Sequence, residues 1–164
     1  MTGGAAVAAA VLMFSLGWGL QHAALTSPQV LGHAAPALEI QRPSGYLVDI
    51  SSYQGRPLVL NFWASWCGPC AQELPVLSAA FDRYPGVVFV GADMNDTTQG
   101  YTEFELAHPH PYATGAIVVG SSQAYGVVGP PTTFFINSDN VVVASFSGPL
   151  DAQTLDHYVA LIKS

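Results

Sequence analysis

The sequence predicts one α/β domain in which a mixed β-sheet is flanked by helices. Three observations support this fold class. Apolar runs typical of buried strands alternate with segments of helical periodicity. A predicted β-hairpin and a closing helix follow in the last third of the chain. The only two cysteines, in the order Cys-Gly-Pro-Cys, lie where a predicted strand passes into a predicted helix. A chain of 164 residues is long enough for one such domain with a proper core.

The N-terminal segment is apolar and precedes this domain. No charged residue occurs from Gly3 to Leu20, and these 18 residues would span about 27 Å as a helix, close to the thickness of the hydrocarbon layer. A cleavable signal segment is the alternative, but an A-x-A-like site is missing just after the apolar run. We expect residues 1–25 to form a membrane anchor or signal segment, residues 26–31 a tether, and residues 32–164 the folded domain.

The first half of the domain contains three predicted strands and one helix. Tyr46–Ile50 is a short strand, and Pro57–Ala64 is apolar, β-branched or aromatic, which suits a strand buried on both faces. Pro69–Tyr84 has apolar residues at helical spacing, with Pro75 as an expected kink. Val87–Asp93 is the second buried strand.

The second half of the domain contains two predicted helices and the hairpin. Gln99–Ala107 is a weaker helix that ends before a His-Pro-His-Pro stretch. Thr132–Ile136 and Val141–Phe146 flank an Asn-Ser-Asp-Asn turn and predict a β-hairpin. Asp151–Ile162 carries an apolar stripe and predicts the closing helix.

Charge and composition exclude some partners. The chain has four Lys or Arg residues against 11 Asp or Glu residues, a net charge of −7 and a pI of about 4.8. Nucleic-acid binding needs a cationic surface that releases counterions from phosphate. Docking on anionic lipid headgroups needs basic residues as well. We therefore expect no nucleic-acid partner, and membrane attachment only through the N-terminal segment.

The spacing of the two cysteines predicts a redox centre. Positions i and i+3 of a first helical turn share a face at roughly 5–6 Å, within the range that a disulfide needs. Cys67 faces the unpaired N–H groups and the positive end of the helix dipole, which favour its thiolate. We expect Cys67 to attack and Cys70 to resolve. Pro69 fits the start of a helix because its missing N–H costs nothing there, and Gly68 lets a substrate backbone approach the sulfur.

Other uses of the cysteines are weaker interpretations. A structural disulfide that closes a four-residue loop contributes only about 2 kcal/mol, against roughly 4.7 kcal/mol for a long loop. A zinc site needs two more ligands, and the paired His108 and His110 are expected to be solvated turn residues. An iron–sulfur cluster needs four cysteines in its usual form. We expect no metal and no cofactor besides the Cys67–Cys70 disulfide.

Several segments resemble the thioredoxin superfamily, and within it the membrane-anchored ResA/TlpA-like branch. The run "FWASWCGPC" (Phe62–Cys70) resembles the superfamily's active site. "LGHAAPALEI" (Leu31–Ile40) resembles the branch's G-x-x-A-P-x-x-x-[LI] motif, and "AYGVVGPPTTFFINSDNVVV" its cis-proline segment. The resemblance covers residues 32–163 and is loosest over 97–122. It implies a thioredoxin-like fold with an N-terminal β-hairpin extension and a thiol–disulfide oxidoreductase outside the cytoplasm, in the periplasm or at the outer face of the cell membrane. The protein would be secreted if its N-terminal segment is cleaved.

The resemblance also implies roles for individual residues near the cysteines. Pro131 would be the cis-proline packed against the Cys67–Cys70 pair, although a trans Pro131 that merely breaks a loop is an alternative. Cytosolic thioredoxins have a titratable Asp where this chain has Asn61, which cannot titrate. Glu73 takes the matching place of the branch's Glu and would relay the proton of Cys70. The alternative is an acidic residue favoured only by the helix dipole.

Substrate contacts are expected from the turn around the cysteines and from the cis-proline segment. Pro130 lacks the N–H that the superfamily offers to a bound peptide at this position, which would weaken peptide binding by about 1 kcal/mol or less and shift substrate choice. The full set of expected substrate-binding residues is Trp66, Gly68, Pro69, Pro130 and Thr132.

The expected reaction is the reduction of disulfides in protein substrates such as apocytochrome c, with electrons from a thiol-type donor in the membrane. A disulfide-forming oxidase of envelope proteins is the main alternative. A metal-handling protein on this fold would space its cysteines by three residues and add a distant His. A peroxidase would have a P-x-x-x-T-x-x-C context, and neither pattern occurs here. A binding-only module is the remaining alternative.

Overall fold

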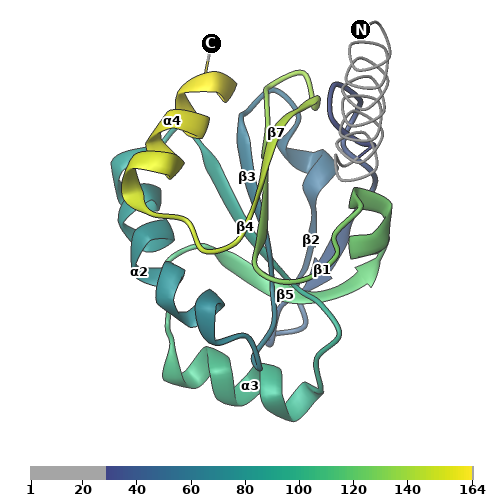
Figure 1. Ribbon diagram of the computed structural model, residues 1–164. Helices are drawn as coiled ribbons and strands as arrows, with labels where there is room; N and C mark the ends of the chain where they lie inside the picture. The colour runs from purple at the N-terminus through teal and green to yellow at the C-terminus, as the bar shows by residue number, and fades with distance from the viewer. Residues whose placement is uncertain (1–28, 164) are drawn as a thin grey trace, which may run out of the picture.

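A seven-stranded mixed sheet runs through the middle of the molecule (Figure 1). The computed structural model describes residues 29–163. The strand order is β2-β1-β5-β4-β3-β6-β7. The three central strands, β5 (Ala113–Val119), β4 (Val88–Asp93) and β3 (Leu58–Trp63), are parallel to one another, and every other pair is antiparallel. The predicted α/β class with a mixed sheet is therefore confirmed.

Antiparallel pairs of strands form the two edges of the sheet. At one edge β1 (Glu39–Gln41) pairs with β2 (Leu47–Asp49). At the other edge β6 (Thr132–Ile136) pairs with β7 (Val142–Ser147), which is the predicted hairpin. Asn137 closes this hairpin, because its side-chain oxygen accepts hydrogen bonds from two N–H groups of the turn.

Helices α2 (Gly68–Arg83) and α4 (Ala152–Ile162) lie side by side on one face of the sheet, and α3 (Thr98–Ala107) lies beyond its lower end (Figure 1). Two single-turn 3₁₀ helices, η1 (Ile50–Tyr53) and η2 (Ser122–Tyr125), complete the fold. All three predicted helices are thus present, each within one residue of the expected bounds at both ends.

The core has two layers because successive strand residues point to opposite faces of the sheet. The layer under α2 and α4 contains Val59, Leu77, Ala80, Phe89, Phe135, Leu155, Val159 and Ile162. The layer on the other face contains Leu38, Ile40, Leu60, Phe62, Val90, Tyr125 and Phe134. A third, smaller cluster surrounds the cysteines and includes Trp63, Tyr101 and Phe104. The cysteines therefore sit at the junction of β3, α2 and α3.

Two features of the α3–β5 region differ from expectation. Strand β5 was not among the predicted strands, because Thr114 and Gly115 interrupt its apolar pattern. Gly115 is required there: a Cβ atom on it would come within 2.5 Å of the Gln41 carbonyl oxygen on β1. The expectation that His110 is solvated is wrong. Its side chain is 2% exposed, and its Nε2 lies 3.3 Å from Glu105 Oε1.

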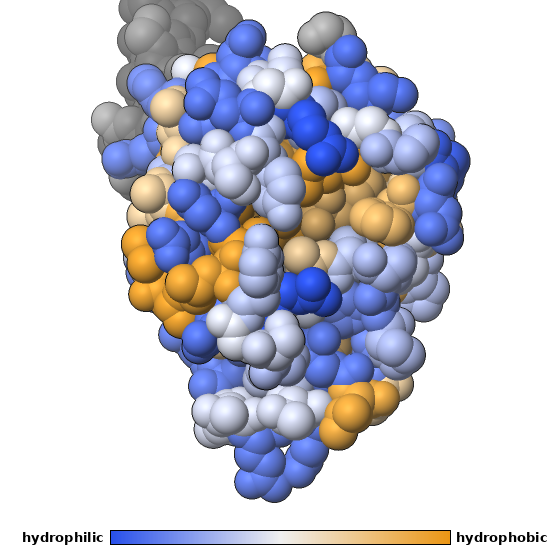
Figure 2. All heavy atoms as spheres, turned by 180° about the vertical axis from the view of Figure 1, so that it is seen from behind, coloured by the Kyte–Doolittle hydropathy of each residue, from blue (hydrophilic) through white to orange (hydrophobic). Residues whose placement is uncertain are grey.

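The predicted anchor or signal segment, residues 1–25, lies outside the described residues, as do residues 26–28 of the predicted tether. Within residues 29–163 no helix combines the length and apolarity needed to cross a bilayer. The surface seen from behind is largely hydrophilic, with separate apolar areas between polar residues (Figure 2). The exposed large apolar residues come from several elements and include Leu47, Trp66, Leu106, Val119 and Val128.

Candidate active site

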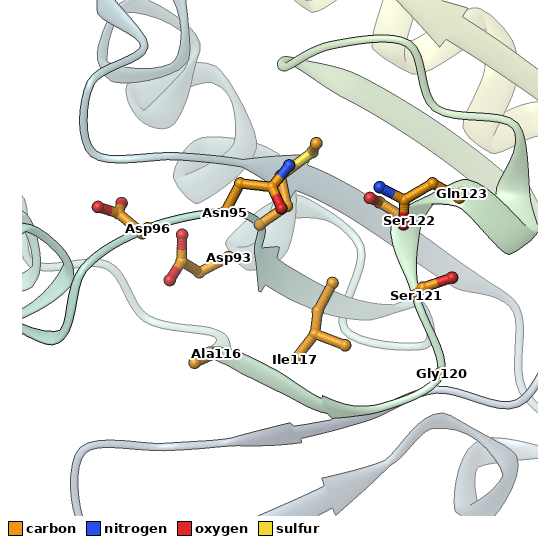
Figure 3. Close-up of a pocket in the computed structure, with 10 residues that line it drawn as sticks. Asp93, Asn95, Asp96, Ala116, Ile117, Gly120, Ser121, Ser122 and Gln123 are labelled. Atoms are coloured by element: carbon orange, nitrogen blue, oxygen red, sulfur yellow. The ribbon is translucent and has the colours of Figure 1, made fainter.

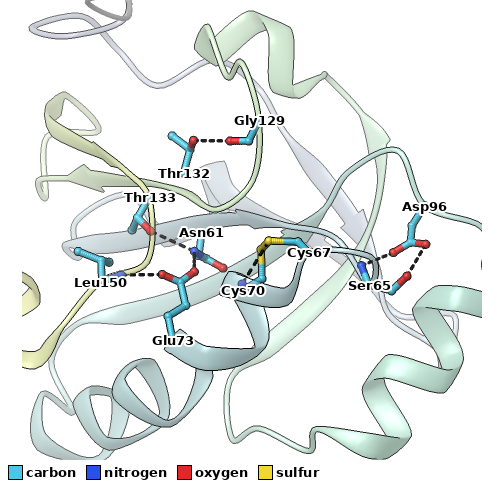
Figure 4. Close-up of a disulfide and its surroundings, with 10 residues drawn as sticks. All are labelled: Asn61, Ser65, Cys67, Cys70, Glu73, Asp96, Gly129, Thr132, Thr133 and Leu150. Carbon is cyan, nitrogen blue, oxygen red and sulfur yellow. Dashed lines mark hydrogen bonds between the residues drawn. A yellow bond between two sulfur atoms is a disulfide. The ribbon is translucent and has the colours of Figure 1, made fainter.

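Cys67 and Cys70 form a disulfide at the N-terminus of α2 (Figure 4). Their Cα atoms are 5.3 Å apart, as the i, i+3 spacing predicts. Cys67 is the N-cap residue, with an extended backbone (φ −91°, ψ 97°), and its sulfur accepts a hydrogen bond from the Cys70 N–H at 3.2 Å. Pro69 lies in the first turn, where no N–H is needed. The Cys67 sulfur therefore occupies the position where the helix offers its unpaired N–H groups.

The residues that flank the disulfide in the turn are exposed, although the sulfurs are largely covered. Cys67 is 4% and Cys70 1% exposed. Gly68 and Pro69 are exposed, and Trp66 is 59% exposed, with its indole N–H donating to the Asn95 carbonyl at 3.4 Å. Trp66, Gly68 and Pro69 thus present the surface from which a partner would reach the disulfide.

The segment before β6 lies at the same end of the sheet as the disulfide. Thr132 pairs with Phe62, close to the end of β3 from which the chain enters the active-site turn. The Pro130–Pro131 peptide bond is cis. Pro131 is buried and Pro130 half-buried. Thr132 is buried, and its hydroxyl donates to the Gly129 carbonyl at 2.7 Å, within its own loop.

Glu73 lies beyond the first turn of α2, on the side of the helix that faces the sheet. It is 1% exposed. Its two oxygens accept hydrogen bonds from different elements (Figure 4): Asn61 Nδ2 on β3 donates to Oε1 at 2.7 Å, and the Leu150 N–H donates to Oε2 at 3.0 Å. Asn61 Nδ2 donates also to Thr133 Oγ1 at 3.0 Å. A favourable helix dipole alone does not account for a carboxyl group placed in this way.

Burial raises the pKa of Glu73 to about 7, although the hydrogen bonds from Leu150 and Asn61 oppose the increase. A carboxyl group with this pKa changes its protonation state near neutral pH. It lies on the same helix as Cys70, three residues further on. The site therefore combines a cystine with a buried group that can take up or release a proton under physiological conditions.

Replacing Asn61 by alanine should raise the pKa of Glu73 further, because Oε1 loses its donor and the ionised form loses a hydrogen bond. We expect the free energy of unfolding to fall by about 1–3 kcal/mol. A carboxyl-¹³C NMR titration of Glu73 measures the pKa. The matched control is Thr133→Val, which removes the other partner of Asn61 and should leave the Glu73 pKa nearly unchanged. An unchanged pKa in Asn61→Ala would contradict the assigned hydrogen bond.

Sequence reasoning missed a second set of contacts, which holds the active-site turn from the other side. The carboxylate of Asp96, in the β4–α3 loop, accepts hydrogen bonds from both the N–H and the hydroxyl of Ser65 (Figure 4). Ser65 lies two residues before Cys67, so Asp96 fixes the chain that leads into the cystine. No motif identifies this contact. The signal that was available is the position of the loop after a parallel strand, where ligand sites of α/β sheets commonly lie.

Comparison with known proteins gives consistent relationships. A model of the AhpC/TSA family matches residues 31–145. The thiol–disulfide oxidoreductase ResA of Bacillus subtilis is 26% identical over 161 residues, 93% of this chain and 88% of that protein. ResA of Bacillus anthracis is 28% identical over 138 residues, 80% of this chain and 78% of that protein.

Solved structures give the same relationship. A putative thiol:disulfide interchange protein DsbE from Chlorobium tepidum superposes with a TM-score of 0.74 at 27% identity and covers 82% of this chain and 98% of its own. StoA from Bacillus subtilis superposes with a TM-score of 0.61 at 25% identity and covers 76% of this chain and 98% of its own.

Proposed function

Because the chain belongs to the AhpC/TSA family and is a thioredoxin-fold thiol–disulfide oxidoreductase of the ResA and DsbE type, we propose that it reduces disulfides of protein substrates outside the cytoplasm. The observation that carries the proposal is the position of the Cys67 sulfur at the N-cap of α2, where it accepts a hydrogen bond from the Cys70 N–H. Once the disulfide is reduced, that N–H group and the helix dipole stabilise a thiolate at Cys67.

The first exchange uses Cys67 as the nucleophile. Its thiolate attacks one sulfur of a substrate disulfide, a Cys67–substrate disulfide forms, and the other substrate sulfur leaves as a thiolate. Trp66, Gly68 and Pro69 form the exposed surface on which the substrate lies, and the Pro130–Pro131 segment supports it from the β6 side. Cys70 stays buried during this step, because it is the less exposed cysteine of the pair.

The second exchange uses Cys70. Its thiol gives its proton to the Glu73 carboxylate, and the resulting thiolate attacks the Cys67 sulfur. The Cys67–Cys70 disulfide forms, and the second substrate sulfur leaves as a thiolate, so that two electrons have passed from the enzyme to the substrate. A Glu73 pKa of about 7 suits this transfer, because the carboxylate is populated near neutral pH yet basic enough to accept the proton.

The enzyme must then be reduced again by a thiol-type donor. A membrane-bound donor fits a chain whose apolar N-terminal segment anchors it, with the domain in the periplasm or at the outer face of the cell membrane. Apocytochrome c is the substrate class that the ResA-like resemblance suggests. Secretion, after cleavage of the N-terminal segment, is the alternative location.

The opposite direction is the second candidate function: the same cystine could oxidise thiols of envelope proteins. The Gly-Pro dipeptide between the cysteines, which matches reducing thioredoxins, favours reduction. A peroxidase is not favoured, because Leu60 and Ala64 stand where its P-x-x-x-T-x-x-C pattern requires Pro and Thr.

The reduction potential of the Cys67–Cys70 pair tests the direction. Equilibration with glutathione buffers and mass spectrometry of the trapped thiols should give a potential below about −200 mV, on the reducing side of protein disulfide isomerase. An insulin-reduction assay checks activity on a protein disulfide. A potential above about −150 mV would support the oxidase instead.

Replacing Pro130 by valine should strengthen binding of extended protein substrates. Valine supplies the N–H that proline lacks, and one added hydrogen bond of about 1 kcal/mol corresponds to an affinity increase of about fivefold or less. The KM for a protein disulfide measures this effect. Pro109→Ala, in the loop after α3, is the control. Equal KM values for the wild type and Pro130→Val would remove the proposed role of Pro130 in substrate choice.

A further inference from the structure

The β4–α3 loop binds the two residues that precede Cys67. The Asp96 carboxylate accepts one hydrogen bond from Ser65 on each oxygen: the N–H donates to Oδ2, and the hydroxyl donates to Oδ1 at 2.8 Å. The Asn95 carbonyl accepts a hydrogen bond from the indole N–H of Trp66 at 3.4 Å. Two adjacent residues of the loop therefore hold two adjacent residues of the active-site turn.

The backbone of the loop has an unusual conformation at this contact. Asn95 has a φ of 57°, in the left-handed region that residues other than glycine seldom occupy, although asparagine tolerates it better than most. Such conformations persist where the surrounding structure fixes them, and they are concentrated at functional sites. The left-handed residue directly precedes Asp96 and supplies the carbonyl that Trp66 contacts.

The first turn of α3 lies directly against the contact between Ser65 and Asp96. Gly100 is the helix residue at this point, and a Cβ atom on it would come within 2.7 Å of both Ser65 Oγ and Asp96 Oδ1. Glycine weakens a helix relative to alanine. The space that the contact needs explains why a glycine stands here, in the first turn of a helix.

A second carboxyl group lies beside Asp96. Asp93 ends β4 and is 5% exposed, and its carboxyl group is directed toward Asp96 (Figure 3). Burial is the main reason that the pKa of Asp93 rises to about 8, and the charge of Asp96 and a hydrogen bond between the two side chains add to the increase. At neutral pH Asp93 is therefore mostly protonated and donates to the Asp96 carboxylate, which keeps its charge.

Cys67 has contacts of its own that do not involve the loop. Its N–H donates to the Ala64 carbonyl at 3.1 Å, and its sulfur accepts a hydrogen bond from the Cys70 N–H at 3.2 Å. Trp66 is 59% exposed, and its indole is hydrogen-bonded to the loop instead of the helix. Loss of the loop contacts should therefore free Ser65 and Trp66 and leave the Cys67 sulfur at the N-cap of α2.

We propose that Asp96 is a positioning residue that makes the enzyme favour protein disulfides over small disulfides, because it fixes the Ser65–Trp66 turn on which a protein substrate lies. The inference rests on the proposed reduction of protein disulfides. A protein substrate gains affinity from a surface that is already held in one conformation, since ordering a mobile surface costs conformational entropy. A small disulfide needs only access to the Cys67 sulfur, so it gains little from Asp96.

Single-turnover reduction by the prereduced full-length protein tests the proposal, with insulin as the protein disulfide and 2-hydroxyethyl disulfide as a small, uncharged one. In Asp96→Ala the second-order rate constant should fall about tenfold with insulin and less than about twofold with the small disulfide. The loss with insulin should lie in the half-saturating concentration and not in the maximal rate. Asp139→Ala, at the exposed β6–β7 turn, is the control and should match the wild type with both disulfides.

Gly100→Ala is a second variant, and it keeps every polar atom of the contact. The added methyl group should separate Ser65 from Asp96 and reproduce the selective loss with insulin, although alanine favours the helix. The matched control is Gly86→Ala, because a Cβ atom there meets no atom within 4 Å. A selective loss in Asp96→Ala but not in Gly100→Ala would assign the effect to the charge of Asp96 and overturn the positioning role.

Equal losses with both disulfides would also overturn the proposal, since the loop would then act on Cys67 itself, and so would unchanged rates in both variants. Each of these results leaves the proposed function intact, because the wild type still reduces insulin. Failure of the wild type to reduce insulin would count against the proposed function. If Asp96→Ala does not fold, Asp96→Asn replaces it: it keeps one acceptor oxygen, and a smaller loss that is still selective for insulin is expected.

Discussion

Replacing Cys70 by serine should stop turnover and accumulate a covalent enzyme–substrate complex. Cys67 keeps its place at the N-cap of α2 and still attacks the substrate, but no thiol remains to displace it from the mixed disulfide. Insulin reduction should fall to background. Mass spectrometry without reductant should show the chain joined to one substrate molecule through Cys67.

The matched variant is Cys67→Ser, which keeps the second sulfur and removes the first. It should form no mixed disulfide, because Cys70 is 1% exposed and lies inside the helix. A Cys67→Ser variant that captures substrate as efficiently as Cys70→Ser would reverse the two roles. Both variants fold around the same core, since neither sulfur closes a long loop.

Replacing Glu73 by glutamine should slow release of the substrate and remove a pH dependence of stability. Loss of a positioned proton acceptor typically costs 10²-fold or more in rate, so breakdown of the mixed disulfide should slow by about 10²-fold near pH 7. The limb of the pH–rate profile that reflects the Glu73 pKa of about 7 should disappear. Stopped-flow fluorescence of substrate release, from pH 5.5 to 8.5, measures the release rate and its pH dependence.

The effect on stability follows from the raised pKa of Glu73. The group titrates near 4.5 in the unfolded chain and near 7 in the folded protein, so the folded state binds more protons between these values. The stabilising contribution is complete below about pH 4.5 and is lost as the pH rises through 7, a change of about 3 kcal/mol. Asp93, with a pKa raised to about 8, adds a change of the same sign.

Urea unfolding of the oxidised protein between pH 4.5 and 8 separates these two groups. The difference between wild type and Glu73→Gln isolates the Glu73 share, and Glu103→Gln, on the exposed side of α3, is the control. The glutamine variant should also be less stable at low pH by about 1–3 kcal/mol. Its NH₂ group must face either the Asn61 amide or the Leu150 N–H, and both are donors. Identical pH dependence in the variant and the wild type would show that Glu73 does not titrate as described.

Local signals predicted most of the fold because they agree with the final packing. Strand β3 is buried on both faces, so its apolar run predicts a strand without information about the neighbouring strands. The turn of Cys67 and Pro69 at the start of α2 followed from helix capping and from the spacing of the cysteines. Glu73 was identified through a family resemblance, and its burial depends on contacts 12 and 77 residues away in the sequence.

The parts that sequence reasoning missed depend on distant neighbours. Strand β5 contains Gly115 because β1 passes close to it, and no local pattern contains that information. His110 was expected to be solvated because it lies in a Pro-rich loop, yet its side chain is buried next to Glu105. Asp93 is buried at the end of β4, and its burial depends on neighbours that no local pattern of the sequence identifies.

The Leu150 N–H donates to Glu73 Oε2, so the C-terminal segment helps to position the carboxyl group that we propose as proton acceptor. Leu150 directly precedes Asp151, the N-cap residue of α4. A protease cut between β7 and α4 would therefore leave both cysteines in place. It would still weaken the hydrogen bond that the Leu150 N–H donates to Glu73, the proposed proton acceptor. Truncated versions that end at the hairpin would lose this donor, and fusion partners attached to the C-terminus need a linker that lets α4 dock.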